Sequence, residues 1–458
     1  MSGSVVWQGP FVTFARLKEY KFVKILHVVH GYPPSIGGSQ WLTKMLSEHL
    51  VAQYQDEVTV FTTVAYHMEY FWKGKQVDTT PPPLAPSRKL GGGWGRGLGE
   101  GERETMPAGT EIVNGVTVRR FPVFNGLSKL RMVLAGIAYR LRLPFNDWLR
   151  TLYTGPIIPG LARAIAESGA DVVFGTAFPL LHMYYAVAGA RRAGIPVVLL
   201  GAIHTADTWG YKRPMIYRAI QRADAYIAHT TFERDYLIAR GIAAEKISVI
   251  GAGVDAEAFV NADGATIRER YGWENDPVIA TLGKQTPRKR FDTLLQAMPR
   301  VWETYPNARL LIAGSRGPDT PKIQQAIQTF PRERQKQIRI VSDFPDADKP
   351  LLLAACDVFA LPSGQESFGI AFVEAWACGK PVIGARTGAI PAVIAEGEDG
   401  LLATYGDPED FAQAILALLN DPQRRIAMGK AGQAKVLEKY TWDIVTDSVR
   451  GVYEQVCR

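Results

Sequence analysis

The sequence predicts an α/β protein with two doubly wound, Rossmann-like domains that face each other across a cleft. Two observations predict this architecture. Short, almost continuously apolar runs alternate with amphipathic helical patterns, as parallel strands buried on both faces require. The alternation is interrupted once, between Gly251 and about Pro277, by a linker-like stretch, and then restarts. Because ligands of such sheets bind at the carboxyl ends of the strands, we expect the ligand in the cleft.

The strand-like runs divide into two sets along the chain. They are residues 22–30, 57–63, 171–175, 196–201, 224–229 and 247–251, then 278–283, 308–314, 337–341, 357–362 and 381–385. We expect one domain at 1–252, a second at 253–438 and a final segment at 439–458. A flexible insertion is expected at about 66–110, because much of it is Pro-rich and then Gly-rich. Within 112–121, Asn114-Gly115 predicts a hairpin with a type I′ turn.

Composition limits the class of protein. The chain has 458 residues, of which 47% are hydrophobic and 21% charged, and a formal net charge of +7. These values are typical of globular proteins and exclude a disordered or coiled-coil chain. A surplus this small does not indicate a nucleic-acid partner, so none is expected. It suits an anionic small molecule or weak attraction to an acidic membrane.

The cysteines and the first residues indicate the compartment. Cys356, Cys378 and Cys457 have no metal-ligand spacing and cannot form a disulfide scaffold, which favours a reducing compartment. The first 24 residues lack the clean apolar core of a signal peptide. No run reaches the roughly 18 apolar residues of a membrane span. We expect a cytoplasmic protein.

Residues 127–151 are rich in both basic and large apolar residues. Lys129, Arg131, Arg140, Arg142 and Arg150 accompany one acid, Asp147. One interpretation is an interfacial helix on anionic lipid. The other, which the break at Pro144 favours, is an ordinary surface helix that packs against the sheet.

The most informative segment is 361–383. A strand and a Pro-Ser-Gly turn precede a helix that is expected to begin near Ser367–Phe368. The free amides of this helix start, around Phe368, Gly369 and Ile370, would bind an anion with help from the helix dipole. A glycine at this place would let a ligand approach the backbone closely.

Glu366 and Glu374 bracket this helix start. Along one helix, eight residues span about 12 Å with about 80° of rotation, which is roughly the reach of a nucleoside diphosphate sugar. Glu366 could then meet the sugar while Glu374 holds the ribose hydroxyls. The alternative is an ordinary helix-start acid and a surface glutamate. The strand, the turn and the Ser-Phe-Gly sequence between the two carboxylates favour a functional role.

A basic loop follows the first strand of the second domain. Lys284, Arg288, Lys289 and Arg290 lie between a strand that ends at Gly283 and the next helix. In the cleft such charges could neutralise a diphosphate. We expect this role for Lys284 and Lys289, and a solvated loop position for Arg288 and Arg290.

Two features of the first domain point to the same cleft. Gly37-Gly38 lies between the first strand and its helix, where phosphates can pass close to the backbone, and it lacks the GxGxxG of dinucleotide binding. His204 follows a strand end and is the histidine best placed for the cleft; the others are interpreted as structural, except His30, for which the sequence does not decide. Asp346-x-Asp348 could hold a divalent metal, but it precedes a helical pattern and is interpreted as helix capping. No metal site is expected.

Together these motifs resemble the retaining glycosyltransferases of family 4, which have the GT-B architecture. The resemblance runs from about residue 22 to the end and is most specific in the Glu366–Glu374 segment, in Gly283–Lys289 and in 397–425. It implies an acceptor-side domain at 1–252 and a nucleotide-sugar-binding domain at 253–438. It also implies that the last helix crosses back onto the first domain. Lys284 stands where the family usually has arginine, and Ser342–Pro345 lacks the family's usual glycine.

The resemblance assigns roles to these residues. Glu374 would bind the donor ribose, and Glu366 would contact the transferred sugar beside the amides of Phe368, Gly369 and Ile370. The diphosphate would be held by Lys284 and Lys289, with the Gly37-Gly38 loop closing over it. His204 would touch the sugar at the reacting face. The family implies metal-independent transfer with retention of configuration, without a cofactor, from a nucleotide diphosphate sugar to an acceptor hydroxyl.

The acceptor remains open between a glycan, a lipid-linked molecule and a small molecule. The basic segment 127–151 slightly favours a membrane-linked acceptor and a peripheral contact with the inner face of an anionic membrane. Two other functions of the same fold are a nucleotide-sugar epimerase and a non-catalytic sugar-nucleotide-binding protein. A glycosidase that uses Glu366 and Glu374 is disfavoured, because its carboxylates must flank one bond at about 5–5.5 or 6.5–9.5 Å.

Overall fold

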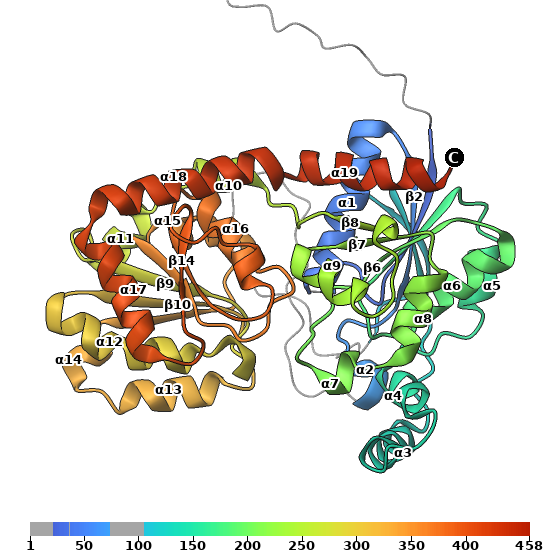
Figure 1. The fold of residues 1–458 in the computed structure, drawn as a ribbon, viewed down its shortest axis with the longest axis horizontal. Coiled ribbons are helices and arrows are strands. Elements are labelled where there is room, and N and C mark those ends of the chain that lie inside the picture. The colour runs from blue at the N-terminus through green and yellow to red at the C-terminus, as the bar shows by residue number, and fades with distance from the viewer. Residues whose placement is uncertain (1–21, 36, 74–104) are drawn as a thin grey trace, which may run out of the picture.

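The computed structural model describes residues 22–35, 37–73 and 105–458 and contains two α/β domains (Figure 1). Each domain is built on its own sheet, and all neighbouring strands are parallel except in one hairpin. The predicted fold class is confirmed. Residues 74–104, which make up most of the insertion predicted to be flexible, lie outside the described residues.

The first sheet has the strand order β3-β4-β2-β1-β5-β6-β7-β8. Its strands are β1 (Lys24–Val28), β2 (Glu57–Thr63), β3 (Gly109–Val113), β4 (Val116–Phe121), β5 (Val172–Thr176), β6 (Val197–Leu200), β7 (Ala225–Ala228) and β8 (Ile247–Val249). The antiparallel pair β3–β4 turns at Asn114 and Gly115, which have φ angles of 49° and 82°. Positive φ at both central residues is the type I′ geometry, so the hairpin prediction is confirmed.

Helices cover both faces of this sheet. The helices of this domain are α1 (Gly38–Tyr54), α2 (Tyr70–Lys73), α3 (Ser128–Arg140), α4 (Asn146–Thr154), α5 (Leu161–Ala166), α6 (His182–Ala193), α7 (Thr208–Tyr211), α8 (Pro214–Arg222) and α9 (Thr231–Ile238). Successive residues of a strand point to opposite faces. In β1, Ile25 therefore joins the core under α1, whereas Leu26 joins the core under α5 and α6.

The second sheet has the order β11-β10-β9-β12-β13-β14 and encloses one continuous core. Its strands are β9 (Val278–Leu282), β10 (Arg309–Gly314), β11 (Ile338–Ser342), β12 (Val358–Leu361), β13 (Val382–Ala385) and β14 (Gly400–Ala403), the last of which was not predicted. Its helices are α10 (Ala256–Val260), α11 (Ala265–Tyr271), α12 (Phe291–Thr304), α13 (Thr320–Gln328), α14 (Arg332–Gln335), α15 (Lys349–Ala354), α16 (Ile370–Ala377), α17 (Pro408–Asn420) and α18 (Pro422–Lys439).

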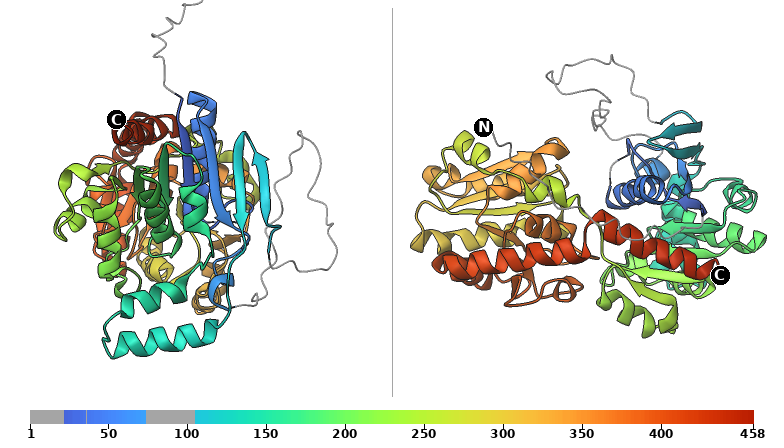
Figure 2. Two further views of the ribbon diagram at one scale, coloured as in Figure 1. Left: turned by 90° about the vertical axis from the view of Figure 1, so that its right-hand side faces the viewer. Right: turned by 90° about the horizontal axis from the view of Figure 1, so that it is seen from above.

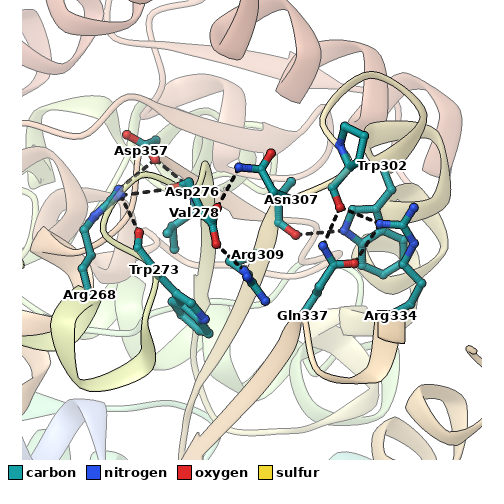
Figure 3. A network of polar contacts seen from close by, with 12 residues as sticks. Arg268, Trp273, Asp276, Val278, Trp302, Asn307, Arg309, Arg334, Gln337 and Asp357 are labelled. Atoms are coloured by element: carbon teal, nitrogen blue, oxygen red, sulfur yellow. Dashed lines mark hydrogen bonds and ion pairs between the residues drawn. The ribbon is translucent and has the colours of Figure 1, made fainter. Parts of the chain in front are cut away.

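A polar network fixes the amino-terminal edge of this sheet (Figure 3). Asp357 accepts hydrogen bonds from Arg268 at 2.8 Å and from the Val278 amide at 2.9 Å, which joins the starts of β12 and β9. Asp276 accepts from Arg309 at 2.7 Å at the start of β10. Since the network holds the strand starts in register, the strand ends at the opposite edge are positioned as a set.

The stretch from Gly251 to Pro277, predicted to be linker-like, belongs mostly to the second domain. Its apolar residues Phe259, Ile267 and Trp273 are buried in the second core, in and after α10 and α11. The polar residues that suggested a linker lie on these two short helices and in the turns beside them, and two of them, Arg268 and Asp276, belong to the network at the strand starts. The linker interpretation is therefore wrong for most of the stretch.

The last two helices run along both domains (Figure 2, right). The first of them, α18, packs on α16, and α19 (Trp442–Val456) packs on α1 of the first domain. The buried side chain of Arg450 in α19 bonds to Asp56 of the first domain at 2.8 Å. Between the two helices, Tyr440 accepts a hydrogen bond from the Val254 amide, so both chain crossings between the domains lie side by side.

Residues 127–151 form a helical hairpin at the edge of the first domain (Figure 2, left). Its helices α3 and α4 pack on each other and on α2, and Pro144 lies in the turn between them. The prediction that this segment packs against the sheet is therefore wrong. In the described part of the chain, no helix is both long and apolar enough to cross a membrane.

Candidate active site

The basic loop after β9 and the segment after β12 meet at the carboxyl edge of the second sheet. The Lys289 Nζ lies 2.6 Å from Glu366 Oε1, and both side chains are about nine-tenths buried. A short 3-10 turn, Pro287–Lys289, aims the lysine inward, and its stem crosses Gly283, where a Cβ would lie 3.0 Å from Lys289 Cε. The sequence placed these two groups on different parts of the donor, and the fold joins them.

The ion pair controls the ionisation of Glu366. Burial, the largest single influence, opposes the charged form, but the charge and hydrogen bond of Lys289, with smaller contributions from Ser363 and Arg288, together outweigh it and lower the pKa of Glu366 below its usual range. The carboxylate is therefore negatively charged at neutral pH. A buried carboxylate with one fixed cation beside it retains acceptor capacity for further hydrogen bonds.

Helix α16 begins later than predicted. Its first residue is Ile370, and Gly369 precedes it with a φ of 90°. A Cβ at Gly369 would also lie 2.6 Å from Phe372 Cδ2, so both the backbone angle and the space require glycine. Glu366 is therefore not helical, and the predicted spacing of the two carboxylates along one helix is wrong. The Phe372 amide bonds to the Gly369 carbonyl at 2.9 Å, whereas the amides of Phe368, Gly369 and Ile370 have no such partner among the described residues, as the anion site requires.

Glu374 lies inside α16 and has its own cation. Lys349 Nζ, at the start of α15, lies 3.0 Å from Glu374 Oε1. Burial raises the pKa of Glu374, and Lys349 offsets only part of that effect. The sequence pattern around Lys349 suggested a role only for Asp346 and Asp348, so the pairing of Lys349 with Glu374 was not predicted.

The two acids before Lys349 do not cap its helix as predicted. Asp348 occupies the N-cap position of α15 but its side chain makes no capping hydrogen bond, and Asp346 instead lies 3.8 Å from Lys349 Nζ. The capping interpretation is therefore wrong. Asp346 supports the lysine that holds Glu374.

His204 reaches this group from the first domain. Burial is the main reason that its pKa is lowered to about 4. The positive charge of Arg288 lowers the pKa further, while Glu366 opposes the shift. The imidazole is therefore neutral at pH 7, although it lies within electrostatic reach of groups on the second domain. Its Nδ1 is buried and lacks a hydrogen-bond partner, so a binding group remains available there.

The fold separates the two arginines that the sequence treated alike. Arg290 pairs with Asp292 at 3.1 Å and lies over the Tyr405 ring, a local role on its own domain. Arg288 is exposed, and its charge acts on His204. Sequence reasoning therefore missed Arg288 as a member of the charged group, because only the tertiary fold places the first domain opposite it.

Other predicted site residues are less closely associated. Lys284 is exposed and forms no ion pair in the described residues. Gly37 precedes α1, and a Cβ there would lie 2.3 Å from Gln40 Oε1, while Gly38 faces open space. Within the described ranges, no hydrogen bond or ion pair joins these glycines to the Lys289–Glu366 pair. The requirement for glycine at position 37 is therefore explained by its contact with Gln40 in the same segment.

The side chain of Phe368 has a structural role, in addition to the role predicted for its backbone amide. Its side chain is buried where the domains meet, with its ring 5.8 Å from that of His229 and 5.2 Å from that of Tyr440. A Cβ on Gly251 would lie 2.8 Å from the Phe368 ring. The residue before the helix start is thereby fixed against both chain crossings.

In the loop Ser342–Pro345 an aspartate adopts the backbone conformation for which the family usually has a glycine. Asp343 has a φ of 54°, in the left-handed region that aspartate tolerates better than most residues. Its carboxylate accepts the Arg316 amide at 3.0 Å and pairs with the Arg316 side chain at 3.3 Å. These contacts hold the loop in the backbone conformation that glycine would adopt freely.

The site residues form no metal-ligand cluster and do not line the cavity against the first sheet. Among the described residues, no three His, Cys, Asp or Glu side chains gather in a way that could hold a metal ion. A cavity of about 680 Å³ lies against the first sheet at Phe61 and Phe121, and none of the predicted site residues lines it.

Comparison with known proteins identifies the family. The family described as Glycosyltransferase Family 4 matches residues 113–258, and the one described as Glycosyl transferases group 1 matches residues 263–435. The GDP-mannose-dependent alpha-(1-6)-phosphatidylinositol monomannoside mannosyltransferase of Mycolicibacterium smegmatis is 30% identical over 298 residues, which cover 62% of this chain and 76% of that protein. The D-inositol 3-phosphate glycosyltransferase of Kribbella flavida is 28% identical over 376 residues, or 76% of this chain and 83% of that protein.

Solved structures share the fold. HepE from Anabaena, in complex with UDP and glucose, has a TM-score of 0.67 at 18% identity and covers 94% of this chain and 100% of its own. Sucrose-phosphate synthase from Thermosynechococcus elongatus has a TM-score of 0.66 at 18% identity, with 95% and 99% covered. The family matches and the relatives agree with the two-domain fold: this chain is an enzyme of glycosyltransferase family 4 with the GT-B architecture.

Proposed function

We propose that this enzyme transfers a sugar from a nucleotide diphosphate sugar to an acceptor hydroxyl, with retention of configuration and without a metal ion or cofactor. One observation carries the proposal. His204 of the first domain lies within electrostatic reach of Arg288 and of the Lys289–Glu366 pair of the second. Neutral, cationic and anionic groups from two domains thus converge beside the start of α16.

The charges suit the breaking bond. Cleavage leaves negative charge on the departing diphosphate and positive charge on the sugar ring. Lys289, Lys284 and the amides of Phe368, Gly369 and Ile370 would stabilise the diphosphate. As the bond between the anomeric carbon and the diphosphate oxygen breaks, the acceptor oxygen bonds to the anomeric carbon on the same face. The departing diphosphate oxygen takes the proton of the acceptor hydroxyl. No protein base is needed, in keeping with a His204 whose pKa of about 4 makes it a weak base.

Glu366 and His204 would bind the sugar from opposite sides. Glu366 is ionised and held by Lys289, so it accepts hydrogen bonds from sugar hydroxyls. The unpartnered Nδ1 of His204 would bond to a hydroxyl at the reacting face. Glu374, oriented by Lys349, would hold the ribose, and the Gly37-Gly38 loop would close over the diphosphate.

The names of related proteins support the donor class. The Mycolicibacterium smegmatis relative is named as dependent on GDP-mannose, and HepE was also solved in complex with UDP-glucose. These donors differ in base and in sugar, and they share a nucleoside diphosphate. We propose a donor of this class for the domain at 253–438. The acceptor, a glycan or a lipid-linked molecule, would bind the domain at 1–252.

The proposal is tested by incubating the enzyme with GDP-mannose or UDP-glucose, candidate lipid and glycan acceptors, and EDTA. We expect a glycoside whose anomeric configuration, read from the proton NMR coupling, equals that of the donor. An inverted product, or activity that EDTA abolishes, would contradict retention or metal independence. An epimerised donor without acceptor would indicate an epimerase. Nucleotide binding without any turnover would indicate a non-catalytic binding protein.

The protein is proposed to act in the cytoplasm, with a peripheral contact to the anionic inner face of the membrane. The phosphatidylinositol-based name of the Mycolicibacterium smegmatis relative supports a lipid-linked acceptor.

A further inference from the structure

Helix α3 buries small residues and exposes large apolar ones, the reverse of a surface helix in water. Its buried positions are Ala135 and Ala138, which are 0% and 1% exposed. Its large apolar side chains are exposed instead: Leu130, Met132, Val133, Leu134 and Ile137. A surface helix of a globular protein buries such residues and exposes polar ones. The exposed face formed by Leu130, Val133, Leu134 and Ile137 therefore suits an apolar partner.

The contacts of the hairpin fix this orientation. Arg131 of α3 turns inward and donates to the carbonyls of Leu152 at 2.8 Å and Phe71 at 3.3 Å. Asp147 of α4 accepts from the Met215 amide at 3.2 Å. Because these polar groups are held on the inner side, α3 cannot rotate to bury its leucines without breaking them.

The turn between α3 and α4 extends the exposed apolar surface. Phe145 is 75% exposed, and Leu141, Leu143 and Trp148 are exposed beside it. Contiguous apolar surface of this kind marks interaction sites in soluble proteins. We call these side chains, with those of α3, the hairpin surface.

The exposed charged side chains of the hairpin itself have one sign. Lys129, Arg140 and Arg142 are exposed along it, whereas the single acid, Asp147, is buried. Two copies of the chain that met through this surface would bring like charges together, which disfavours a symmetric dimer. Anionic lipid headgroups would neutralise the charges while acyl chains receive the apolar side chains.

We propose that the hairpin surface docks on an anionic lipid bilayer. Leucine, isoleucine and aromatic side chains enter the boundary between headgroups and acyl chains, and the three basic side chains lie at the headgroups. This inference deepens the proposed function, on which its catalytic part rests; the binding part stands by itself.

The hairpin is joined to the segment that carries His204. Arg150 of α4 is buried and donates to the carbonyls of Trp209 at 2.6 Å and Lys212 at 3.2 Å. The rings of Tyr139 in α3 and Trp209 in α7 are 4.8 Å apart. Docking therefore positions the His204–Lys212 segment relative to the membrane, and a lipid-linked acceptor would reach the site from this side.

The first test is co-sedimentation of the full chain with vesicles of phosphatidylcholine, with and without added phosphatidylglycerol. We expect binding that needs the anionic lipid and weakens as salt rises. The double variant V133E/I137E should reduce binding at least about tenfold. The matched control I426E/L437E introduces the same charges at exposed apolar positions of α18 and should bind like the parent. Circular dichroism and thermal melts establish that each variant is folded.

A second variant isolates the electrostatic contribution. K129Q/R140Q should lower affinity for anionic vesicles by about fivefold for each lost cation and leave the melting temperature unchanged. Absence of vesicle binding by the parent at low salt would overturn the inference. So would a concentration-dependent dimer in sedimentation velocity that V133E/I137E abolishes, since the surface would then be an interface between copies.

An activity measurement separates this inference from the proposed function. V133E/I137E should lose transfer to an acceptor embedded in vesicles while it binds GDP or UDP as the parent does. Binding to vesicles without any transfer by the parent would support the docking surface and reject the transferase proposal. Equal transfer to embedded acceptor by parent and variant would reject the docking surface alone.

Discussion

Lys289 and Glu366 form a buried ion pair, with 2.6 Å between Lys289 Nζ and Glu366 Oε1, although 77 positions separate them in sequence. In the proposed site the lysine faces a diphosphate and the glutamate faces a sugar. The pair therefore links the two halves of the donor. Loss of either side chain leaves the other charge buried and uncompensated.

Lys289→Ala should weaken binding of the donor by about tenfold or more, because a charge-assisted hydrogen bond contributes about 1.5–3 kcal/mol. It should also raise the pKa of Glu366, since burial then acts without its opposing cation. Calorimetric titration with GDP and UDP measures the first effect, and Lys284→Ala, at an exposed position, gives a comparison on the same loop. Unchanged nucleotide affinity in Lys289→Ala would contradict the diphosphate role.

His204→Ala should lower turnover about a hundredfold and leave nucleotide affinity nearly unchanged, because the imidazole is assigned to the reacting face of the sugar. The pKa of His204 is lowered to about 4, so the histidine stays neutral as pH falls from 8 to 5. The turnover of the parent should therefore show no titration near pH 6.5 that His204→Gln removes. Steady-state kinetics over this range, together with nucleotide calorimetry, check both statements.

Gly369→Ala should destabilise the protein and weaken donor binding. The substitution places a Cβ at a φ of 90° and only 2.6 Å from Phe372 Cδ2. Gly397→Ala is the matched control, because Gly397 has a φ of 85° but no atom within 4 Å of the added Cβ. Both variants should lose about 1 kcal/mol from the backbone angle, and only Gly369→Ala should lose more. Equal urea midpoints would refute the steric part of the argument.

Asp56→Ala should destabilise the protein by about 1.5–3 kcal/mol, because it removes the carboxylate that joins Arg450 to the first domain, while Glu454 still accompanies the guanidinium. Glu57→Ala, the neighbouring residue, removes an exposed contact with Lys24 at 3.8 Å and should change stability by less than about 0.5 kcal/mol. Urea unfolding followed by circular dichroism compares the two. A similar small effect for both would mean that the pair does not anchor α19.

Stability should fall as pH drops below about 6.5. Burial lowers the pKa of His27 and of His30 to about 3, and that of His182 to about 4. Between these values and 6.5 the unfolded chain binds more protons than the folded one, so the free energy of unfolding rises with pH. His30→Asn should reduce this slope because it removes one of the titrating groups. The substitution breaks no side-chain hydrogen bond, since neither ring nitrogen of His30 has a partner. Urea midpoints at pH 7.5 and 5 test the prediction.

The sequence by itself predicted the two parallel α/β sheets, because strands buried on both faces must be apolar throughout and their helices amphipathic. It also predicted the Asn114-Gly115 hairpin, whose turn depends on local backbone angles. It misread 251–277 as a linker and placed the start of α16 too early. Helix boundaries and short helices depend on packing partners that a local pattern does not contain.

Only the tertiary structure decided which charges meet. Lys349 binds Glu374, and Arg288 faces His204, because strand ends that are distant in sequence converge at one edge of a sheet and two domains lie opposite each other. The hairpin surface likewise appears only after folding. A chain with leucines and arginines in alternation does not show which will be exposed, since inward hydrogen bonds of Arg131 and Asp147 choose the buried face.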